Sequence, residues 1–391
     1  TTPPPVIPVP PAKPVSPQIP FDLSRLSDIE KTGLSFSDDL LKRYAVSLLT
    51  KPFVILSGLS GSGKTRLALA FAKWMAEDEK KQVKIVAVGA DWNSREYLLG
   101  YPNGLTPGKY VRPENGVLDF VLEAAREENS RKPFFLILDE MNLSYVERYF
   151  SDFLSAMESK EAVTLHPEGA EWEAGEPDVP ARVKFPENLF LIGTINVDET
   201  TYMFSPKVLD RANVIEFRIS REEMNKFLTK CNPVDATAVN GLGAPMGEDF
   251  VRICKEKELA YDKDAHHEEL LSFFDALKPV GAEFGYRTAH EIYRFMAIAG
   301  RVDAKWEREA LMDIVVMQKM LPRLHGSRKK MQPVLKVLWE LCKADRKDKE
   351  LLIEAEKMTF GKEFRYPLSA EKIWLMYRNA QDNGFTSYAE A

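Results

Sequence analysis

The 391-residue chain is long enough for two packed domains and a tail, and its 45% hydrophobic content is ordinary for a globular protein. No stretch approaches the roughly 18 continuous apolar residues of a membrane span, and the N-terminus lacks a signal-peptide pattern, so we expect a cytoplasmic protein without membrane contact. A net charge of -6 gives no global attraction to nucleic acid, so DNA contact would need a local patch or a further domain.

The N-terminal segment is rich in proline. Nine of the first twenty residues are proline, which forbids helix and predicts an extended linker over residues 1–20. Because the chain begins at Thr1 rather than Met, we expect a larger parent protein whose upstream domain would recognise the target. The cysteines form no Cys-x-x-Cys pair, which argues against a disulfide framework and a zinc site; they are Cys231, Cys254 and Cys342.

Residues 21–220 alternate helical patterns with short apolar runs. A helical pattern begins at Leu40, and others cover Thr65–Met75 and Leu118–Arg126. The apolar runs are Phe53–Leu56, Val83–Val88, Phe134–Leu138, Leu189–Ile195 and Val214–Phe217. This alternation predicts an α/β domain with a parallel sheet covered by helices on both faces. The segments Val163–His166 and Ala181–Phe185 flank a Gly, Glu and Pro-rich stretch, which indicates an inserted hairpin.

After Ser220 the pattern becomes helical. Apolar residues follow helical spacing around Ala289–Ala299, Leu311–Leu321, Val334–Leu341 and Ile373–Tyr377. We expect an all-α lid over residues 221–345 and a helical C-terminal tail over residues 346–391.

A phosphate-binding loop lies between the first strand and the following helix. The sequence Gly58-Leu59-Ser60-Gly61-Ser62-Gly63-Lys64-Thr65 fits the pattern G-x-x-x-x-G-K-[ST]. Its glycines let backbone N–H groups converge on phosphate oxygens at the positive end of a helix. Lys64 is expected to reach the β and γ phosphates, and the Thr65 hydroxyl is expected to bind Mg²⁺.

Polar side chains end two other apolar strands. Asp139 and Glu140 follow Phe134–Leu138, and Asn196 ends the strand that begins at Leu189. Because the carboxyl ends of parallel strands face the ligand crevice, Asp139 can hold the Mg²⁺ shell while Glu140 activates the attacking water. Asn196 could hold that water near the γ phosphate, or it could simply terminate its strand.

These residues resemble the AAA+ superfamily, specifically its McrB-like branch of restriction motors, to which the MoxR and dynein-related ATPases are close. The resemblance runs from about Leu40 to Arg218. It rests on the phosphate-binding loop and on the stretches 97–101 (YLLGY), 138–143 (LDEMNL) and 193–198 (GTINVD). The resemblance implies that Asn196 is the first sensor, that Arg211 is an arginine finger reaching a neighbour's nucleotide, and that Arg287 is the second sensor.

Two departures from the McrB-like pattern bear on the choice of nucleotide. Glu199 and Thr200 replace an Arg-Ser pair, and a single Arg211 stands where several consecutive arginines are usual. Both lean toward the dynein-related pattern, and no N-K-x-D guanine-reading element is present. We therefore expect a nucleoside triphosphatase that uses ATP in preference to GTP, with Mg²⁺.

The leading hypothesis is a motor subunit of a McrBC-like DNA restriction or antiviral defence complex. The resemblance implies a ring, expected to be a homo-hexamer, with a McrC-like partner that supplies the nuclease. DNA would be contacted through the complex or an upstream domain. The alternatives are a MoxR-like remodelling chaperone and a nucleotide-gated assembly scaffold with little turnover, although the intact Glu140 argues against the scaffold.

Two weaker signals have both a functional and a structural interpretation. The segment Arg95–Lys109 could be a loop that faces the pore of a ring, or equally a packed turn. The basic residues between Arg323 and Lys330 could contact phosphates, but a solvated loop is the more frequent explanation for such a run. The histidines show no metal-binding spacing.

Overall fold

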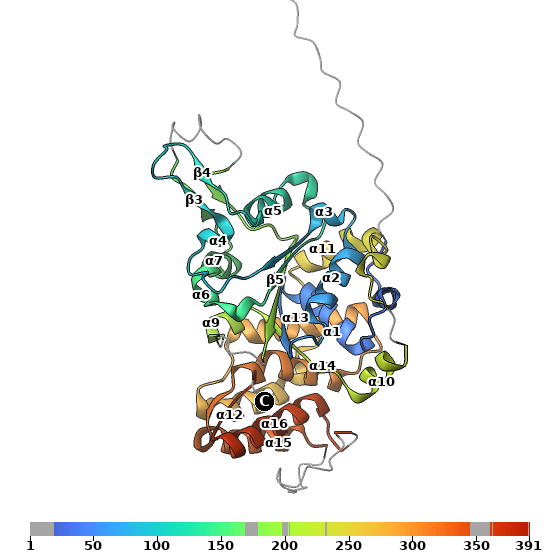
Figure 1. Cartoon of the computed structure of the whole chain (residues 1–391). Coiled ribbons are helices and arrows are strands. Elements are labelled where there is room, and N and C mark those ends of the chain that lie inside the picture. Colours follow the sequence, from blue (N-terminus) through green and yellow to red (C-terminus); the bar gives the residue numbers. More distant parts are fainter. Residues whose placement is uncertain are drawn as a thin grey trace, which may run out of the picture.

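The computed structural model describes residues 19–168, 179–197, 202, 204–230, 233–344, 360–361, 363–389 and 391. Most of the linker over residues 1–20 lies outside these ranges, as do Glu199, Thr200, Cys231 and the first part of the expected C-terminal tail. Figure 1 shows a parallel sheet surrounded by helices, with further helices gathered at the lower end.

The central sheet has five parallel strands in the order β2-β5-β8-β1-β9. Strands β1, β5 and β8 are almost wholly buried, which explains why they are continuous apolar runs rather than alternating ones. The predicted strands are therefore confirmed, with bounds Phe53–Gly58 (β1), Val83–Ala87 (β2), Phe134–Asp139 (β5), Leu189–Asn196 (β8) and Asn213–Phe217 (β9).

Helices cover both faces of this sheet. On one face, Phe71 of α2 packs edge-on against Phe135, and Phe250 of α11 packs against Phe190. On the other face, Phe120 of α5 packs against Phe134, and Phe150 packs against Phe53. The helices around the sheet are α1 (Asp38–Thr50), α2 (Lys64–Met75), α3 (Glu79–Gln82), α4 (Glu96–Leu99), α5 (Val117–Ala124), α6 (Val146–Tyr149), α7 (Ser151–Ser159), α9 (Pro206–Leu209) and α11 (Gly247–Lys255).

Two small hairpins project from the α/β part. The predicted hairpin is present, with β6 (Val163–Thr164) antiparallel to β7 (Arg182–Val183). A second hairpin pairs β3 (Tyr101–Pro102) with β4 (Tyr110–Val111). It begins within the segment Arg95–Lys109, for which the sequence allowed either a pore-facing loop or a packed turn, and ends just after it. Figure 1 shows β3 and β4 at the end of the molecule opposite the C-terminal helices.

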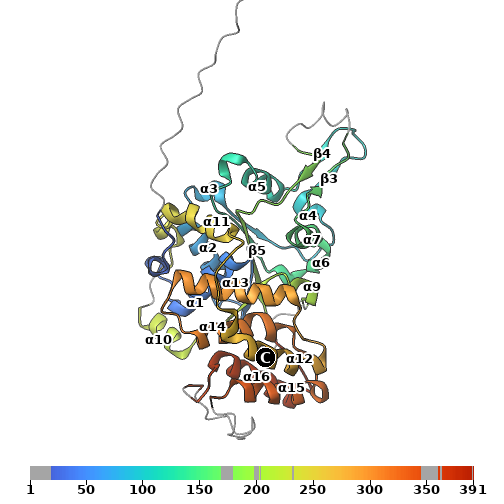
Figure 2. The same ribbon diagram turned by 180° about the vertical axis from the view of Figure 1, so that it is seen from behind.

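The C-terminal part is mainly helical. Figure 2 shows α13 lying between the sheet and the lower helices. Besides α11, the α-helices described after β9 are α10 (Arg221–Lys230), α12 (His267–Leu277), α13 (Tyr286–Val302), α14 (Arg308–Val315), α15 (Arg328–Cys342) and α16 (Pro367–Asn383). A π-helical turn (Val316–Met320) follows α14, and β10 (His325–Ser327) pairs antiparallel with β11 (Phe385–Ser387).

Short 3-10 helices connect these elements. They are Leu23–Thr32, Glu127–Asn129, Met141–Leu143, Ala236–Val239, Ala244–Met246, Lys263–His266, Lys278–Val280 and Leu321–Arg323.

Part of the range assigned to the lid packs onto the α/β part. The backbone N–H of Gly241 donates to the Lys73 carbonyl, and that of Gly243 donates to the Trp74 carbonyl, both at the end of α2. The Asp249 carboxylate accepts a hydrogen bond from the Phe21 N–H at 2.8 Å. Residues 235–255 therefore help to cover α1 and α2. Helix α13 packs against α1, and α12, α14, α15 and α16 gather at the lower end.

Candidate nucleotide-hydrolysis site

The register of the sheet brings the polar strand ends together. Gly58 at the end of β1 is level with Asn196 of β8 and with Phe217 of β9. Leu138 is level with Gly193, so Asp139 follows beside Thr194. The carboxyl ends of β1, β5 and β8 thus meet at one edge, as the sequence predicted.

The phosphate-binding loop fits a bound triphosphate. Gly61 and Gly63 adopt φ values of 72° and 100°, a backbone region in which side chains are rarely tolerated. A Cβ on Gly58 would lie 2.5 Å from the Phe217 carbonyl oxygen, so this position has no room for a side chain. Helix α2 begins at Lys64, whose ammonium donates to the carbonyls of Gly58 at 2.9 Å and Leu59 at 2.6 Å. The Lys64 charge is therefore already held inside the loop.

The two acidic residues are tied to the loop and to strand β8. The Thr65 hydroxyl donates to Asp139 Oδ1 at 2.6 Å, and the Thr194 hydroxyl donates to the same oxygen at 2.7 Å. Asn196 Nδ2 donates to Glu140 Oε1 at 3.2 Å. Glu140 adopts φ 54°, ψ 47°, a left-handed conformation that turns the chain at the end of β5. The structure thus brings Lys64, Thr65, Asp139, Glu140 and Asn196 together.

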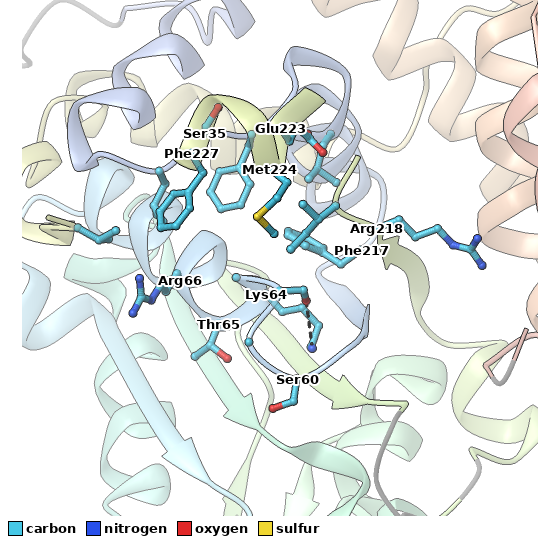
Figure 3. A pocket seen from close by; sticks show the side chains of 18 of the residues that line it. Ser35, Ser60, Lys64, Thr65, Arg66, Phe217, Arg218, Glu223, Met224 and Phe227 are labelled. Atoms are coloured by element: carbon cyan, nitrogen blue, oxygen red, sulfur yellow. Dashed lines mark hydrogen bonds between the residues drawn. The ribbon is translucent and has the colours of Figure 1, made fainter. Parts of the chain in front are cut away.

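A cavity of about 410 Å³ lies over this group. At one end it is bounded by the loop and by Asp139, Glu140 and Asn196. Its other end is apolar, and Figure 3 shows Met224 and Phe227 of α10 reaching down toward the loop. The other apolar lining residues are Leu34, Phe36, Leu40, Phe217, Ile219 and Val234. The cavity therefore has a polar end suited to phosphates and an apolar end suited to a base.

Sequence reasoning missed three features of this site. Thr194 bridges the acidic pair, because its hydroxyl also accepts a hydrogen bond from the Glu140 N–H at 3.0 Å. The apolar cover from α10 was missed, although Ser220 and Glu223 form a reciprocal capping box that marks the start of that helix. Phe36 was missed as well, and nothing in the local pattern links it to the loop.

The structure places Arg211 and Arg287 away from this cavity. Neither belongs to its described lining. Arg211 donates to the carbonyls of Leu154 at 3.1 Å and Lys207 at 2.8 Å and forms an ion pair with Glu158. Arg287 also contacts Glu158, at 2.7 Å. Burial lowers the pKa of Arg211, and the nearby charge of Arg287 lowers it further.

A buried ion network holds the segment that carries Arg211. Glu291 of α13 contacts Lys51 through Oε1 and Lys319 through Oε2, the latter at 2.7 Å. Lys51 also donates to the Asp210 carbonyl at 3.1 Å, and Lys319 donates to the Ala212 carbonyl at 2.9 Å. Burial, with the charge of Lys319 as a smaller cause, lowers the pKa of Lys51 to about 7. Burial acts to raise the pKa of Glu291, but the two lysines hold it below its usual value.

The structure shows where the two weaker sequence signals lie, the segment Arg95–Lys109 and the basic run between Arg323 and Lys330. In the segment Arg95–Lys109, Leu98 and Leu99 are buried while Leu105 at the hairpin tip is 96% exposed, so the base is packed and the tip is free. In the basic run, Arg323 is largely buried and pairs with Asp210, whereas Arg328–Lys330 form the exposed first turn of α15. Neither segment lines the described part of the nucleotide cavity, and their roles stay predictions.

The candidate metal ligands match a magnesium site that is completed by phosphate. Among the described residues, no group of three or more His, Cys, Asp and Glu side chains could hold a metal ion. Thr65 and Asp139, whose side-chain oxygens lie 2.6 Å apart, would supply two oxygen ligands, and Mg²⁺ commonly takes its remaining ligands from phosphates and water. Of the helices described, none has the length and apolar character needed to cross a membrane.

Comparisons with known proteins agree with this fold. Residues 238–385 match a family described as a domain of unknown function (DUF8727). No curated protein matches the chain. The chain is structurally similar to a crystal structure from Cytophaga hutchinsonii described as a candidate ATPase, with a TM-score of 0.52 and 14% identity over 77% of this chain and 87% of that one. The predicted fold class is therefore confirmed: a P-loop α/β domain with a parallel sheet, followed by a helical region.

Proposed function

We propose that this chain hydrolyses a nucleoside triphosphate, with ATP preferred, as an AAA+ motor subunit. The observation that carries the proposal is the joint placement of Lys64, Thr65, Asp139, Glu140 and Asn196 at the polar end of one cavity. Each stands at a strand end or loop position that puts its charge or hydrogen-bonding group beside the expected phosphates.

Each of these side chains has a distinct role in the proposed reaction. Lys64 neutralises the β and γ phosphates, and a bound Mg²⁺ supplies further neutralisation of the charge on the transferred group. Thr65 and Asp139 hold the ion at the loop mouth. Glu140 orients and polarises the attacking water, and the hydrogen bond from Asn196 fixes the direction of the Glu140 carboxylate.

The apolar end of the cavity favours adenine. Guanine presents N1–H and N2–H donors that a free carboxylate recognises, whereas adenine can bind by stacking and apolar contact. Glu223 lines the cavity on the α10 side, but its carboxylate accepts the Ser220 N–H at 2.8 Å and so caps the helix. Phe36, Met224 and Phe227 offer surfaces for stacking.

The position of Arg211 supports oligomeric action. Because Arg211 lies outside the described lining of its own cavity, any contact with a transferred phosphate would be made to a neighbouring subunit's nucleotide. A site completed by a neighbour couples nucleotide binding to assembly, so we propose a ring, with the homo-hexamer as the expected form.

We further propose that the ring belongs to a McrBC-like DNA restriction or defence complex with a nuclease partner. The support is the resemblance of the strand ends 138–143 and 193–198 to that branch. DNA that stimulates hydrolysis several-fold would favour this role, while stimulation by unfolded protein alone would favour a remodelling chaperone.

The deciding experiment replaces Glu140 with Gln. The amide keeps the size and loses the basicity, so turnover should fall about 10²-fold to 10⁴-fold while ATP affinity stays within about threefold. ATP hydrolysis would be measured by phosphate release and affinity by calorimetry. Glu128→Gln, an exposed site outside the described lining of the cavity, is the control and should keep full activity. A Glu140→Gln chain that hydrolyses ATP at the parent rate would refute the assignment.

A further inference from the structure

Arginines from three segments meet at two carboxylates, Glu158 and Asp210, near the amino end of β9. Arg211 lies just before β9, Arg287 lies in the first turn of α13, and both contact the Glu158 carboxylate in the last turn of α7. Arg323 pairs with the neighbouring Asp210 at 2.6 Å, and Arg287 approaches Asp210 at 3.7 Å.

Sheet geometry separates this cluster from the chain's own phosphate-binding loop. Strand β9 runs from Asn213 to Phe217, and Phe217 lines the nucleotide cavity. Arg211 lies in the turn before β9, and the four residue steps from Asn213 to Phe217 alone correspond to roughly 13 Å along an extended strand. Arg287 shares Glu158 with Arg211 and is therefore equally remote. An arginine side chain cannot span that distance, so neither residue serves its own subunit's nucleotide.

The ion pairs of the cluster contain more guanidinium groups than carboxylates. Among the described residues, the ion pairs of these three guanidinium groups involve two carboxylates, Glu158 and Asp210. Two of the guanidinium groups share the single carboxylate of Glu158, whose side chain is 49% exposed. The cluster is thus a site for an anion. In this structure the half-exposed carboxylate of Glu158 occupies it.

The backbone around Arg211 is held firmly, while Glu158 is not. Lys51 and Lys319 hold the carbonyls on either side of Arg211, and two further carbonyls accept the Arg211 Nε and Nη1 protons. Glu158 stands near the C-terminal end of α7, and its described polar contacts are the two arginines. Moving Glu158 aside would therefore expose two preorganised guanidinium groups.

We propose that Glu158 is an internal counter-ion that occupies the anion site of Arg211 and Arg287 until the triphosphate of a second copy of this chain displaces it. A guanidinium group binds carboxylate and phosphate oxygens with the same geometry, so one anion can replace the other. Glu158 then opposes contact between subunits that lack nucleotide, and Arg287 acts together with Arg211 across the interface. The inference rests on the proposed function as a ring-forming triphosphatase.

The first test compares Glu158→Gln with the parent chain. Gln keeps the size and removes the competing charge, so half-maximal assembly should need about threefold to tenfold less non-hydrolysable ATP analogue, the effect expected for one partly exposed ion pair. Assembly would be followed by analytical ultracentrifugation across an analogue titration. Glu161→Gln, an exposed glutamate three residues further on with no described contact to either arginine, is the matched control and should assemble like the parent.

The second test asks which subunit Arg287 serves. Arg287→Ala should leave ATP affinity of the isolated chain unchanged and should abolish most hydrolysis. Mixing it with Lys64→Ala should restore part of the hydrolysis, because an intact loop can then meet an intact pair of arginines. If Arg287 served its own nucleotide, both chains in the mixture would have defective cavities and no activity would return, which overturns the assignment.

The outcomes separate this inference from the proposed function. A parent chain that binds ATP but neither assembles nor hydrolyses it removes the ring proposal, and the inference with it. A parent chain that does both, while Glu158→Gln assembles like Glu161→Gln or needs more analogue than the parent, overturns the inference alone. The inference is supported if Glu158→Gln assembles at lower analogue concentrations than the parent and hydrolysis returns in the mixture of Arg287→Ala with Lys64→Ala.

Discussion

Replacing Glu291 with Gln should destabilise the protein by several kcal/mol. Glu291 pairs with the ammonium groups of both Lys51 and Lys319, and all three side chains are largely buried. Removing the carboxylate charge leaves two buried ammonium groups without their counter-ion. Breaking a buried ion pair by removing one partner costs about 3–5 kcal/mol, and a domain's whole stability is about 5–15 kcal/mol.

The pH dependence follows from the pKa of Lys51. Burial lowers that pKa from 10.5 to about 7, so the folded state binds fewer protons than the unfolded state between these values. The free energy of unfolding of the parent should therefore rise with pH from about 7 to 10.5 and fall as the pH decreases through that window. Without Glu291 the pKa values of both lysines fall further, so the deficit of the variant should be largest near pH 6 and shrink above pH 8.

Urea denaturation at pH 6.0 and 8.5, followed by circular dichroism, measures both effects. Glu309→Gln is the control, because Glu309 pairs with Arg365 at the surface and such a pair contributes about 0–1 kcal/mol. A Glu291→Gln deficit below about 1 kcal/mol at pH 6, or one that grows as the pH rises, would contradict the network as described. Since Lys51 and Lys319 hold the backbone around Arg211, the variant should also lose hydrolysis that depends on a neighbouring subunit.

Three further predictions concern the nucleotide site. Lys64→Ala should weaken ATP binding at least about 100-fold, because a positive charge at the β and γ phosphates is lost, and calorimetry showing unchanged affinity would exclude the loop as the binding site. Chelation of Mg²⁺ should stop phosphate release, and Thr65→Ala should raise the Mg²⁺ concentration needed for half-maximal rate about tenfold; a rate independent of Mg²⁺ would contradict the proposed ligands. Arg211→Ala should lower the rate by about 10³-fold or more, and mixing it with Lys64→Ala should restore part of the activity, unless Arg211 has only a structural role.

The sequence alone determined the α/β fold and predicted which residues form the candidate nucleotide site. Strands β1, β5 and β8 are buried on both faces and are therefore continuous apolar runs, while the two edge strands β2 and β9 were visible as shorter apolar runs interrupted by polar residues. The sequence also placed the phosphate-binding loop beside the acidic end of β5, because parallel strands present their carboxyl ends at one edge of the sheet. The Thr65 to Asp139 hydrogen bond is the outcome of that rule.

Other features depended on contacts that no local pattern encodes. The helical spacing of residues 247–255 shows that one face is buried, but not that Phe250 packs against Phe71 and Phe190 of the α/β part. Likewise the apolar residues of α10 gave no sign that Met224 and Phe227 cover the nucleotide cavity. The apolar periodicity of a helix shows that one of its faces is buried. Which segment covers that face depends on how the whole chain packs.

Charged partners were the least predictable from sequence. The resemblance suggested separate roles for Arg211 and Arg287, and only the tertiary structure brought both onto Glu158 and placed them at the edge of the sheet opposite the phosphate-binding loop. Lys51, Glu291 and Lys319 are equally distant in sequence and meet in one buried network. An ion pair needs only a short distance between its atoms and leaves no periodic trace in the chain, so the folding of α7, α13 and the start of β9 against one another decided which charges would meet.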